Sequence, residues 1–218
     1  CIALTRAFAM FVTFPGPSSI EHPAVLECLE HWKSMGMLDF DTVPADTSGI
    51  VPARSVIDAI RDDTCLVTIM HSNNELGSLQ PIEEIGHLLE SQKDCQGRHI
   101  LFHTDAAQSI SKVDVDVSKS LRRVDMATIV GHKFGAPKGI GALYVKSGTV
   151  TGRFLHGGGQ EKGTRGGTEN VLHIVGMGMA AEIARREMQA TPKQMAKLRN
   201  TLQEEILKQF KEIALVNG

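Results

Sequence analysis

Lys133 is the residue whose place in the sequence most clearly suits chemistry. It follows the apolar, β-branched run 124–130, which predicts an interior strand, and that pattern breaks at Gly131. Ligands of open parallel sheets bind outside the carboxyl ends of the strands, so we expect the Lys133 amine to face a ligand. A lysine desolvated in a pocket becomes a nucleophile toward an aldehyde and forms a Schiff base. The structural alternative is a lysine that extends from the strand end into solvent.

Two further apolar runs end in polar side chains that suit the same site. Run 65–70 leads into the polar segment 71–77, and run 100–104 leads into Asp105 and Gln108. The three-residue spacing of Asp105 and Gln108 predicts a first helical turn in which both side chains face the same side. Taken alone, Asp105 would be interpreted as a helix N-cap. An amine, a carboxylate and amide groups at one edge of a sheet together indicate a functional site.

This set of groups matches what pyridoxal phosphate requires. The cofactor needs a lysine amine for its aldehyde and a carboxylate against its pyridine nitrogen, so that the ring stays protonated and withdraws electrons. It also needs a hydrogen-bond donor to the ring hydroxyl and an anion site for the phosphate. The sequence therefore predicts a pyridoxal phosphate site around Lys133 and Asp105.

The motifs resemble those of the class V, fold-type I pyridoxal phosphate enzymes, the group that contains the cysteine desulfurases and selenocysteine lyases. Several independent motifs in one order make a stronger signal than any one of them. The resemblance implies an α/β fold, with a mostly parallel sheet covered by helices on both faces in a three-layer α/β/α arrangement. The matching segments are 21–25, 70–77 with 80–81, 103–108, 131–133 with 137–144, and 157–161 with 165 and 167–170.

The resemblance also implies roles for individual residues. Lys133 would form the Schiff base and later move the α-proton, Asp105 would pair with the pyridinium nitrogen, and Gln108 would hydrogen-bond the ring hydroxyl. His22 would stack on the open face of the ring. Asn74 would lie over the ring hydroxyl and the substrate carboxylate.

Two more residues carry implied roles at the phosphate. His132 would reach the cofactor phosphate, and Thr168 would reach the phosphate of the neighbouring subunit, which implies a homodimer. The implied reaction removes sulfur or selenium from cysteine or selenocysteine, leaves alanine, and passes the chalcogen to an acceptor, either an enzyme cysteine or an acceptor protein. Val130 favours the selenocysteine lyase side, because many desulfurases carry a serine at that position. None of the four cysteines is assigned the acceptor role: Cys1, Cys28, Cys65 and Cys95.

Parts of the family pattern have no counterpart in the chain. In relatives, the acceptor cysteine and the arginine that grips the substrate carboxylate lie in a later domain, and a glycine and threonine phosphate loop precedes the position of Glu21. We therefore expect an unassigned segment over 1–18, a pyridoxal phosphate-binding large domain over 19–190, and a helix leading into a truncated small domain over 191–218. Two alternatives stay open: a truncated, inactive isoform that acts only by dimerising, and another class V aminotransferase.

Composition argues against several other classes. A net charge of −2 gives no basic surface for nucleic acid. The apolar opening 1–15 is shorter than the roughly 20 apolar residues that a membrane span needs. The cysteines form no C-x-x-C pair and no zinc-spaced cluster, which indicates neither a disulfide framework nor a metal site. We therefore expect the protein to lie in a reducing compartment, the cytoplasm, with the mitochondrion as the alternative. Lys138 precedes Gly139 rather than Ser or Thr, so Gly131 to Gly139 is not a nucleotide-hydrolase phosphate loop.

Helical apolar spacing separates the expected strands and continues after them. The helix expected over 170–187 has an apolar face, in which Met177 and Met179 are predicted to fill the core. The last helix carries charged side chains outward, as is typical of a solvated face. The expected helices cover 23–35, 52–61, 81–91, 170–187 and 191–213.

Overall fold

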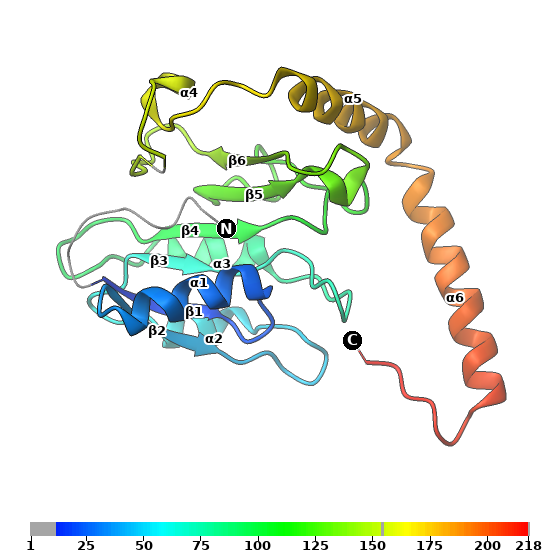
Figure 1. The fold of residues 1–218 in the computed structure, drawn as a ribbon. Helices are drawn as coiled ribbons and strands as arrows, with labels where there is room; N and C mark the ends of the chain where they lie inside the picture. Colours follow the sequence, from blue (N-terminus) through cyan, green and yellow to red (C-terminus); the bar gives the residue numbers. More distant parts are fainter. Residues whose placement is uncertain (1–11, 154, 218) are drawn as a thin grey trace.

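Two groups of hydrogen-bonded strands form the centre of the fold (Figure 1). The structure is a computed structural model that describes residues 12–153 and 155–217. In the larger group the order is β3-β4-β5-β6, in which β6 alone runs antiparallel to its neighbour, and β1 pairs in parallel with β2. The expected α/β fold with mostly parallel strands is confirmed. The strands are β1 Val12–Ser18, β2 Leu38–Val43, β3 Leu66–Thr68, β4 Leu101–Asp105, β5 Met126–Val130 and β6 Gly141–Val145.

The helices lie close to their predicted ranges. Proline at the first helical position begins α1 and is compatible with the missing N–H there. The second helix is shorter than predicted and ends at Asp58. The helices are α1 Pro23–Ser34, α2 Ala53–Asp58, α3 Ile82–Leu89, the 3-10 helix η1 Gly131–Phe134, α4 Gln160–Gly163, α5 Val171–Glu187 and α6 Thr191–Gln209.

Alternation along the strands separates two cores on opposite faces of the larger group. Successive side chains of a strand point to opposite faces, so neighbours in the sequence join different cores. We call these the α1 face and the α3 face, and Figure 1 shows α1 in front of the strands and α3 behind them. The α1 face packs Leu66, Leu101, Met126 and Leu143 with Val25 and Leu29 of α1. The α3 face packs Val67, Phe102, Ala127 and Tyr144 with Ile82, Ile85 and Leu89 of α3.

The connection after β4 does not form the predicted helical turn. The Asp105 carboxylate accepts a hydrogen bond from the backbone N–H of Ala107 at 2.8 Å, and the Ala106 carbonyl accepts one from Ser109 at 3.0 Å. These bonds build consecutive turns, the first of which is the bond that an N-cap residue makes at the beginning of a helix. Ser111 then adopts a left-handed backbone conformation with φ 69°, which a continuing helix does not permit. The prediction of a helix here was wrong.

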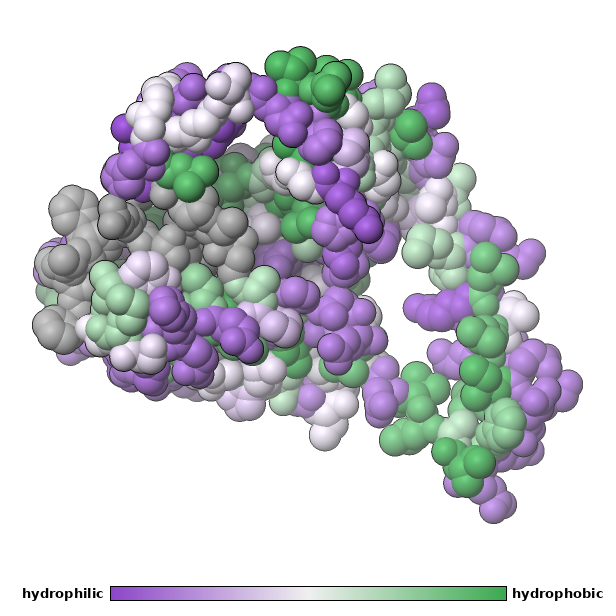
Figure 2. All heavy atoms as spheres, viewed as in Figure 1, coloured by the Kyte–Doolittle hydropathy of each residue, from purple (hydrophilic) through white to green (hydrophobic). Residues whose placement is uncertain are grey.

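The helices α5 and α6 extend away from the strands (Figure 1). Within the described part of α5 only Ala180 is buried, and Met179 is 62% exposed. Figure 2 shows hydrophobic side chains along both helices at the surface. The prediction that Met179 fills the core was therefore wrong for this chain, because no described element packs against that side of the helix.

The segment 1–18, which the motifs left unassigned, is described from residue 12 onward. Residues 12–18 form β1, and they pair with β2 from Val12 opposite Leu38 to Ser18 opposite Val43. The division into an unassigned segment, a large domain and a truncated small domain stays a prediction.

Candidate active site

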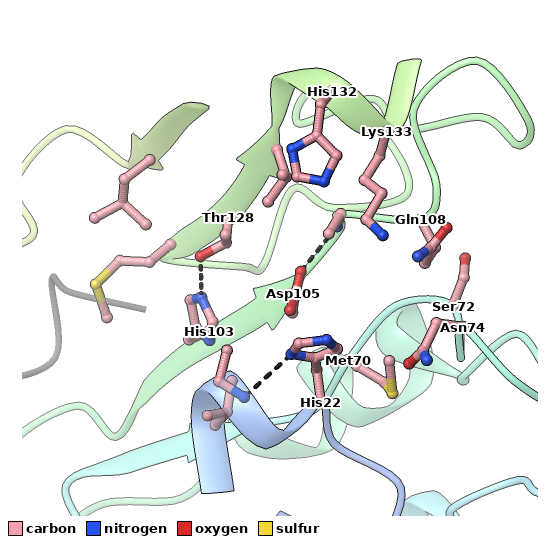
Figure 3. Close-up of a pocket in the computed structure, with 16 residues that line it drawn as sticks. His22, Met70, Ser72, Asn74, His103, Asp105, Gln108, Thr128, His132 and Lys133 are labelled. Carbon is pink, nitrogen blue, oxygen red and sulfur yellow. Dashed lines mark hydrogen bonds between the residues drawn. The ribbon is translucent and has the colours of Figure 1, made fainter. Parts of the chain in front are cut away.

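A cavity of about 290 Å³ opens on the α1 face at the carboxyl ends of β3, β4 and β5. Six of the seven residues predicted from the sequence line it, and Figure 3 shows their side chains around one shared space. Thr168 does not line this cavity, and its side chain is exposed. The six residues are His22, Asn74, Asp105, Gln108, His132 and Lys133.

Strand alternation and register build the floor of the cavity. His103 and Asp105 are two residues apart on β4 and point to the same face, and Asp105 pairs in register with Thr128 of β5. Both His103 and Thr128 line the cavity. Sequence reasoning missed them, although the two-residue spacing from Asp105 was a signal for His103.

The buried ring of His103 bridges two threonine side chains at this floor. Its Nδ1 lies 2.7 Å from Thr68 Oγ1 and its Nε2 lies 2.9 Å from Thr128 Oγ1 (Figure 3 shows the second bond). Burial lowers the pKa of His103 to about 4, because the interior disfavours the charged ring. The ring is therefore neutral near pH 7 and places no positive charge next to Asp105.

Lys133 and His132 lie on η1, which begins directly after β5. A Cβ on Gly131 would lie 2.8 Å from the Ile140 carbonyl oxygen, so this close approach requires glycine. The Lys133 amine points into the cavity on the side of Asp105 and Gln108 (Figure 3). The side chains of His132 and Lys133 are exposed. The described residues therefore do not bury Lys133, although the sequence prediction assumed a desolvated lysine.

Lys112 supports the backbone of η1. Its Nζ donates a hydrogen bond to the Lys133 carbonyl oxygen at 3.2 Å. Burial and the nearby positive charge of Lys133 lower the pKa of Lys112. This contact ties the left-handed turn at Ser111 to the helix that carries the predicted nucleophile.

His22 enters the cavity from the beginning of α1. It is the N-cap residue, and its Nδ1 accepts a hydrogen bond from the backbone N–H of Ala24 at 3.1 Å (Figure 3). That bond fixes the ring at the cavity rim, where it is exposed. The flat face of an imidazole in this place suits contact with a planar ligand.

Glu21 braces the wall next to His22. Its Oε1 accepts hydrogen bonds from Ser18 Oγ at 2.8 Å and from the Met70 backbone N–H at 2.5 Å, which joins the end of β1 to the end of β3. Burial raises the pKa of Glu21 to about 8, and the charge of Asp105 adds to this effect. Among the described residues, Oε2 of this buried carboxyl has no hydrogen-bond partner.

The segment after β3 divides its polar side chains between structure and cavity. Asn73 is structural, because its Oδ1 accepts from the backbone N–H groups of Glu75 and Leu76 and its Nδ2 donates to the Ile20 carbonyl. Asn74 and Ser72 line the cavity instead. Sequence reasoning predicted Asn74 and missed Ser72.

The described cysteines lie outside the cavity lining, and Cys1 is outside the described residues. Burial raises the pKa of the Cys65 thiol to about 11, so Cys65 is not a thiolate near neutral pH. Cys28 is half-buried in α1 and Cys95 is exposed. Within residues 12–153 and 155–217, no three His, Cys, Asp or Glu side chains are placed to hold a metal ion. No helix of that part is long and apolar enough to cross a membrane.

The donor set of the cavity fits pyridoxal phosphate. An amine, a carboxylate, two side-chain amides and three imidazoles surround a space that lies close to the lower end of the usual range for small-ligand sites. An amine and a carboxylate in one cavity can hold an aldehyde and a protonated aromatic nitrogen at the same time.

A protein-family model described as aminotransferase class-V matches residues 17–217. The chain belongs to this family. The resemblance inferred from the motifs is therefore confirmed, and this family and the cysteine desulfurases depend on pyridoxal phosphate.

Curated relatives and solved structures of this family match along most of the chain. The chain is 44% identical over 191 residues to the cysteine desulfurase IscS of Methanosarcina thermophila, which covers 88% of the chain and 45% of that relative. A solved structure titled "NIFS-like protein" has a TM-score of 0.82 at 37% identity and covers 91% of this chain and 52% of its own. Another, titled "SspA in complex with cysteine", has a TM-score of 0.71 at 43% identity, with 83% and 49% covered. The chain spans about half the length of the curated relatives it matches.

Proposed function

We propose that this chain binds pyridoxal 5'-phosphate in the α1-face cavity and supplies the cofactor site of an enzyme that removes sulfur from cysteine and leaves alanine. The observation that supports this most strongly is the convergence of Lys133 and Asp105 on one cavity with four other predicted residues. The identity to cysteine desulfurases and the cysteine complex of a related structure favour cysteine as the substrate. Selenocysteine is the second substrate to compare, because Val130 lines the cavity where many desulfurases carry serine.

Each cavity residue has a proposed task. When bound, the cofactor supplies an electron-withdrawing ring that stabilises negative charge at the substrate α-carbon. Lys133 Nζ holds the cofactor aldehyde and moves the α-proton. The hydrogen bond from Ala107 orients the Asp105 carboxylate, which keeps the ring nitrogen protonated. The neutral His103 beneath it leaves the negative charge of Asp105 undiminished.

The remaining residues orient the ring and the substrate. Gln108 donates to the ring hydroxyl, and His22, held by its N-cap bond, covers the face of the ring. Asn74 lies on the side of the ring hydroxyl and the substrate carboxylate. His132 reaches the phosphate. Together these contacts exclude water from one side of the reacting carbon.

Thr168 supports a proposed homodimer. It is exposed and outside the cavity lining, so a contact with a phosphate requires the cavity of a neighbouring subunit. The sulfur acceptor is proposed to come from outside the described residues or from an acceptor protein, because the described cysteines do not line the cavity and burial keeps the Cys65 thiol protonated. The three cysteines of the described residues are free thiols, which favours a reducing compartment, and we propose the cytoplasm.

Borohydride trapping tests the proposed site directly. The chain is mixed with pyridoxal phosphate, its absorption is recorded, borohydride is added, and the labelled peptide is mapped. We expect the label on Lys133 and a complete loss of labelling in Lys133→Ala. Lys138→Ala, an exposed lysine of the following loop, is the matched control and should label as the wild type does. A label that stays at full strength in Lys133→Ala would contradict the assignment.

Product analysis separates the proposed reaction from its alternatives. Incubation with L-cysteine should yield alanine if the chain carries out the proposed reaction, and a keto acid if it is an aminotransferase. A chain that labels at Lys133 but releases neither product would be the inactive, dimerising form.

A further inference from the structure

Three buried side chains form a continuous hydrogen-bonded chain at the carboxyl edge of the strands. Ser72 Oγ lies 2.6 Å from Ser109 Oγ, and His71 Nδ1 lies 2.7 Å from Ser109 Oγ and 3.3 Å from Ser72 Oγ. The exposed fractions are 7% for Ser72, 0% for Ser109 and 8% for His71. We call this set the serine–histidine chain.

The two ends of the serine–histidine chain reach different cavities. Ser72 lines the α1-face cavity together with Asn74 and Gln108, and Figure 3 shows Ser72 beside these two residues. His71 lines a second, open groove that also contains side chains of α3. Ser109 lines neither of them. A change at Ser109 can therefore reach a ligand in the first cavity only through its neighbours.

The histidine ring decides the direction of the hydrogen bonds. Each serine hydroxyl can donate or accept, whereas one nitrogen of a neutral imidazole donates and the other accepts. Burial lowers the pKa of His71, so the ring is neutral near pH 7. Nδ1 faces Ser109, and the groove that His71 lines contains the carboxylates of Glu83 and Glu84. A neutral histidine side chain ordinarily carries its proton on Nε2, and this tautomer leaves Nδ1 as an acceptor for the serine hydroxyls.

The same groove also contains positive charge. Arg122, Arg123 and His87 line it together with the two glutamates, so the groove is mixed in sign. Two of these positive side chains contact Glu90, which lies outside the groove: Arg123 forms an ion pair with it at 2.9 Å, and His87 lies 3.6 Å from it. The carboxylates of the groove are Glu83 and Glu84, on the first turn of α3.

With Nδ1 as an acceptor, the order of donation follows through the whole chain. Ser109, the nearer hydroxyl, donates to His71, and Ser72 donates to Ser109 or to Nδ1 itself. In either case the Ser72 proton points away from the cavity, and its oxygen keeps a lone pair for the cavity. We propose that His71 and Ser109 are positioning residues that turn Ser72 into a hydrogen-bond acceptor for the protonated nitrogen of a ligand in the α1-face cavity. That the ligand is an α-amino acid rests on the function proposed above, whereas the direction of the hydrogen bonds does not.

Nitrogen-15 NMR of the purified chain without added ligand tests the direction. The signals of His71 are assigned by their absence in His71→Phe. We expect an unprotonated Nδ1 and a protonated Nε2 at pH 7.5. A protonated Nδ1 would reverse every bond in the serine–histidine chain and overturn the proposal.

Ligand titration tests the consequence in the cavity. The chain loaded with pyridoxal phosphate is titrated with L-alanine and, separately, with propionate, which has the same carboxylate but no amine. Ser72→Ala and His71→Phe should each weaken L-alanine binding by about 3- to 10-fold, the usual effect of one hydrogen bond, and leave propionate unchanged. The double variant should be no weaker than Ser72→Ala, because both changes remove the same acceptor.

Ser78→Ala is the matched control, since Ser78 is buried and lines neither cavity. Thermal unfolding of every variant shows whether it is folded. Wild-type affinity in a folded His71→Phe variant, additive losses in the double variant, or an equal loss for propionate would each contradict the proposal. A wild-type chain that takes up no cofactor would refute the function proposed above, and the NMR result would still decide the direction of the bonds.

Discussion

The part of the chain that carries the strands, residues 12–145, and the C-terminal arm of α5 and α6 differ in how far their apolar side chains are buried. Leu29 in α1 is 2% exposed, whereas Leu202 in α6 is 63% exposed. All residues that line the α1-face cavity lie between His22 and Leu143. The candidate site is therefore assembled by the part with a packed core, and the arm contributes nothing to its lining.

Matched leucine substitutions test this contrast most strongly. Leu29→Ala should lower the free energy of unfolding by about 2–5 kcal/mol, because it leaves a cavity in the α1-face core. Leu202→Ala should change it by less than about 0.5 kcal/mol in the same chain. Urea unfolding measures both values. Equal losses would mean that α6 packs against the rest of the protein in solution.

The second largest effect is expected at His103, whose burial should make the free energy of unfolding depend on pH. Its folded pKa of about 4 lies below the ordinary value of 6.5, so the unfolded chain binds an extra proton between these values and stability falls as pH drops from 6.5 to about 4. The expected loss is about 3 kcal/mol. His103→Gln should flatten this part of the pH profile. His87→Gln, at an exposed position of α3, should leave it unchanged.

A smaller effect, on pyridoxal phosphate binding, should distinguish Asn74 in the cavity from Thr168 outside it. Asn74→Ala should weaken pyridoxal phosphate binding by about 10-fold through loss of one hydrogen bond. Thr168→Ala should change it by less than about twofold when the chain is dilute and monomeric. Fluorescence titration at low and high protein concentration measures both variants. A tenfold loss for Thr168→Ala in the dilute chain would place Thr168 in its own subunit's site.

Much of the larger strand group could be predicted from the sequence, because its strands are buried. The run 124–130 contains β5, and the run 100–104 overlaps β4, since both lie between two apolar cores. The pair β1 and β2 was not predicted. β2 carries Asp39 and Asp41 at exposed positions, so its sequence lacks the apolar run that indicates an interior strand.

The site residues that were predicted all lie within sequence motifs of the family. His103 and Thr128 acquire their place from the register of β4 against β5, and a single sequence does not contain that register. Ser72 and Ser109 are 37 positions apart and meet only in the folded chain. The helical turn expected after Asp105 does not form, although the carboxylate makes an N-cap bond to Ala107, because the backbone at Ser111 is left-handed.

The buried carboxyl of Glu21 makes the wall beside His22 sensitive to alkaline pH. Below about pH 8 the carboxyl keeps its proton; above it, ionisation would leave a buried anion whose Oε2 has no hydrogen-bond partner among the described residues. Because the folded pKa is raised, the fold is also penalised as pH rises from about 4.5 to about 8. The joint that Glu21 makes between the ends of β1 and β3 is therefore more stable in neutral than in alkaline solution.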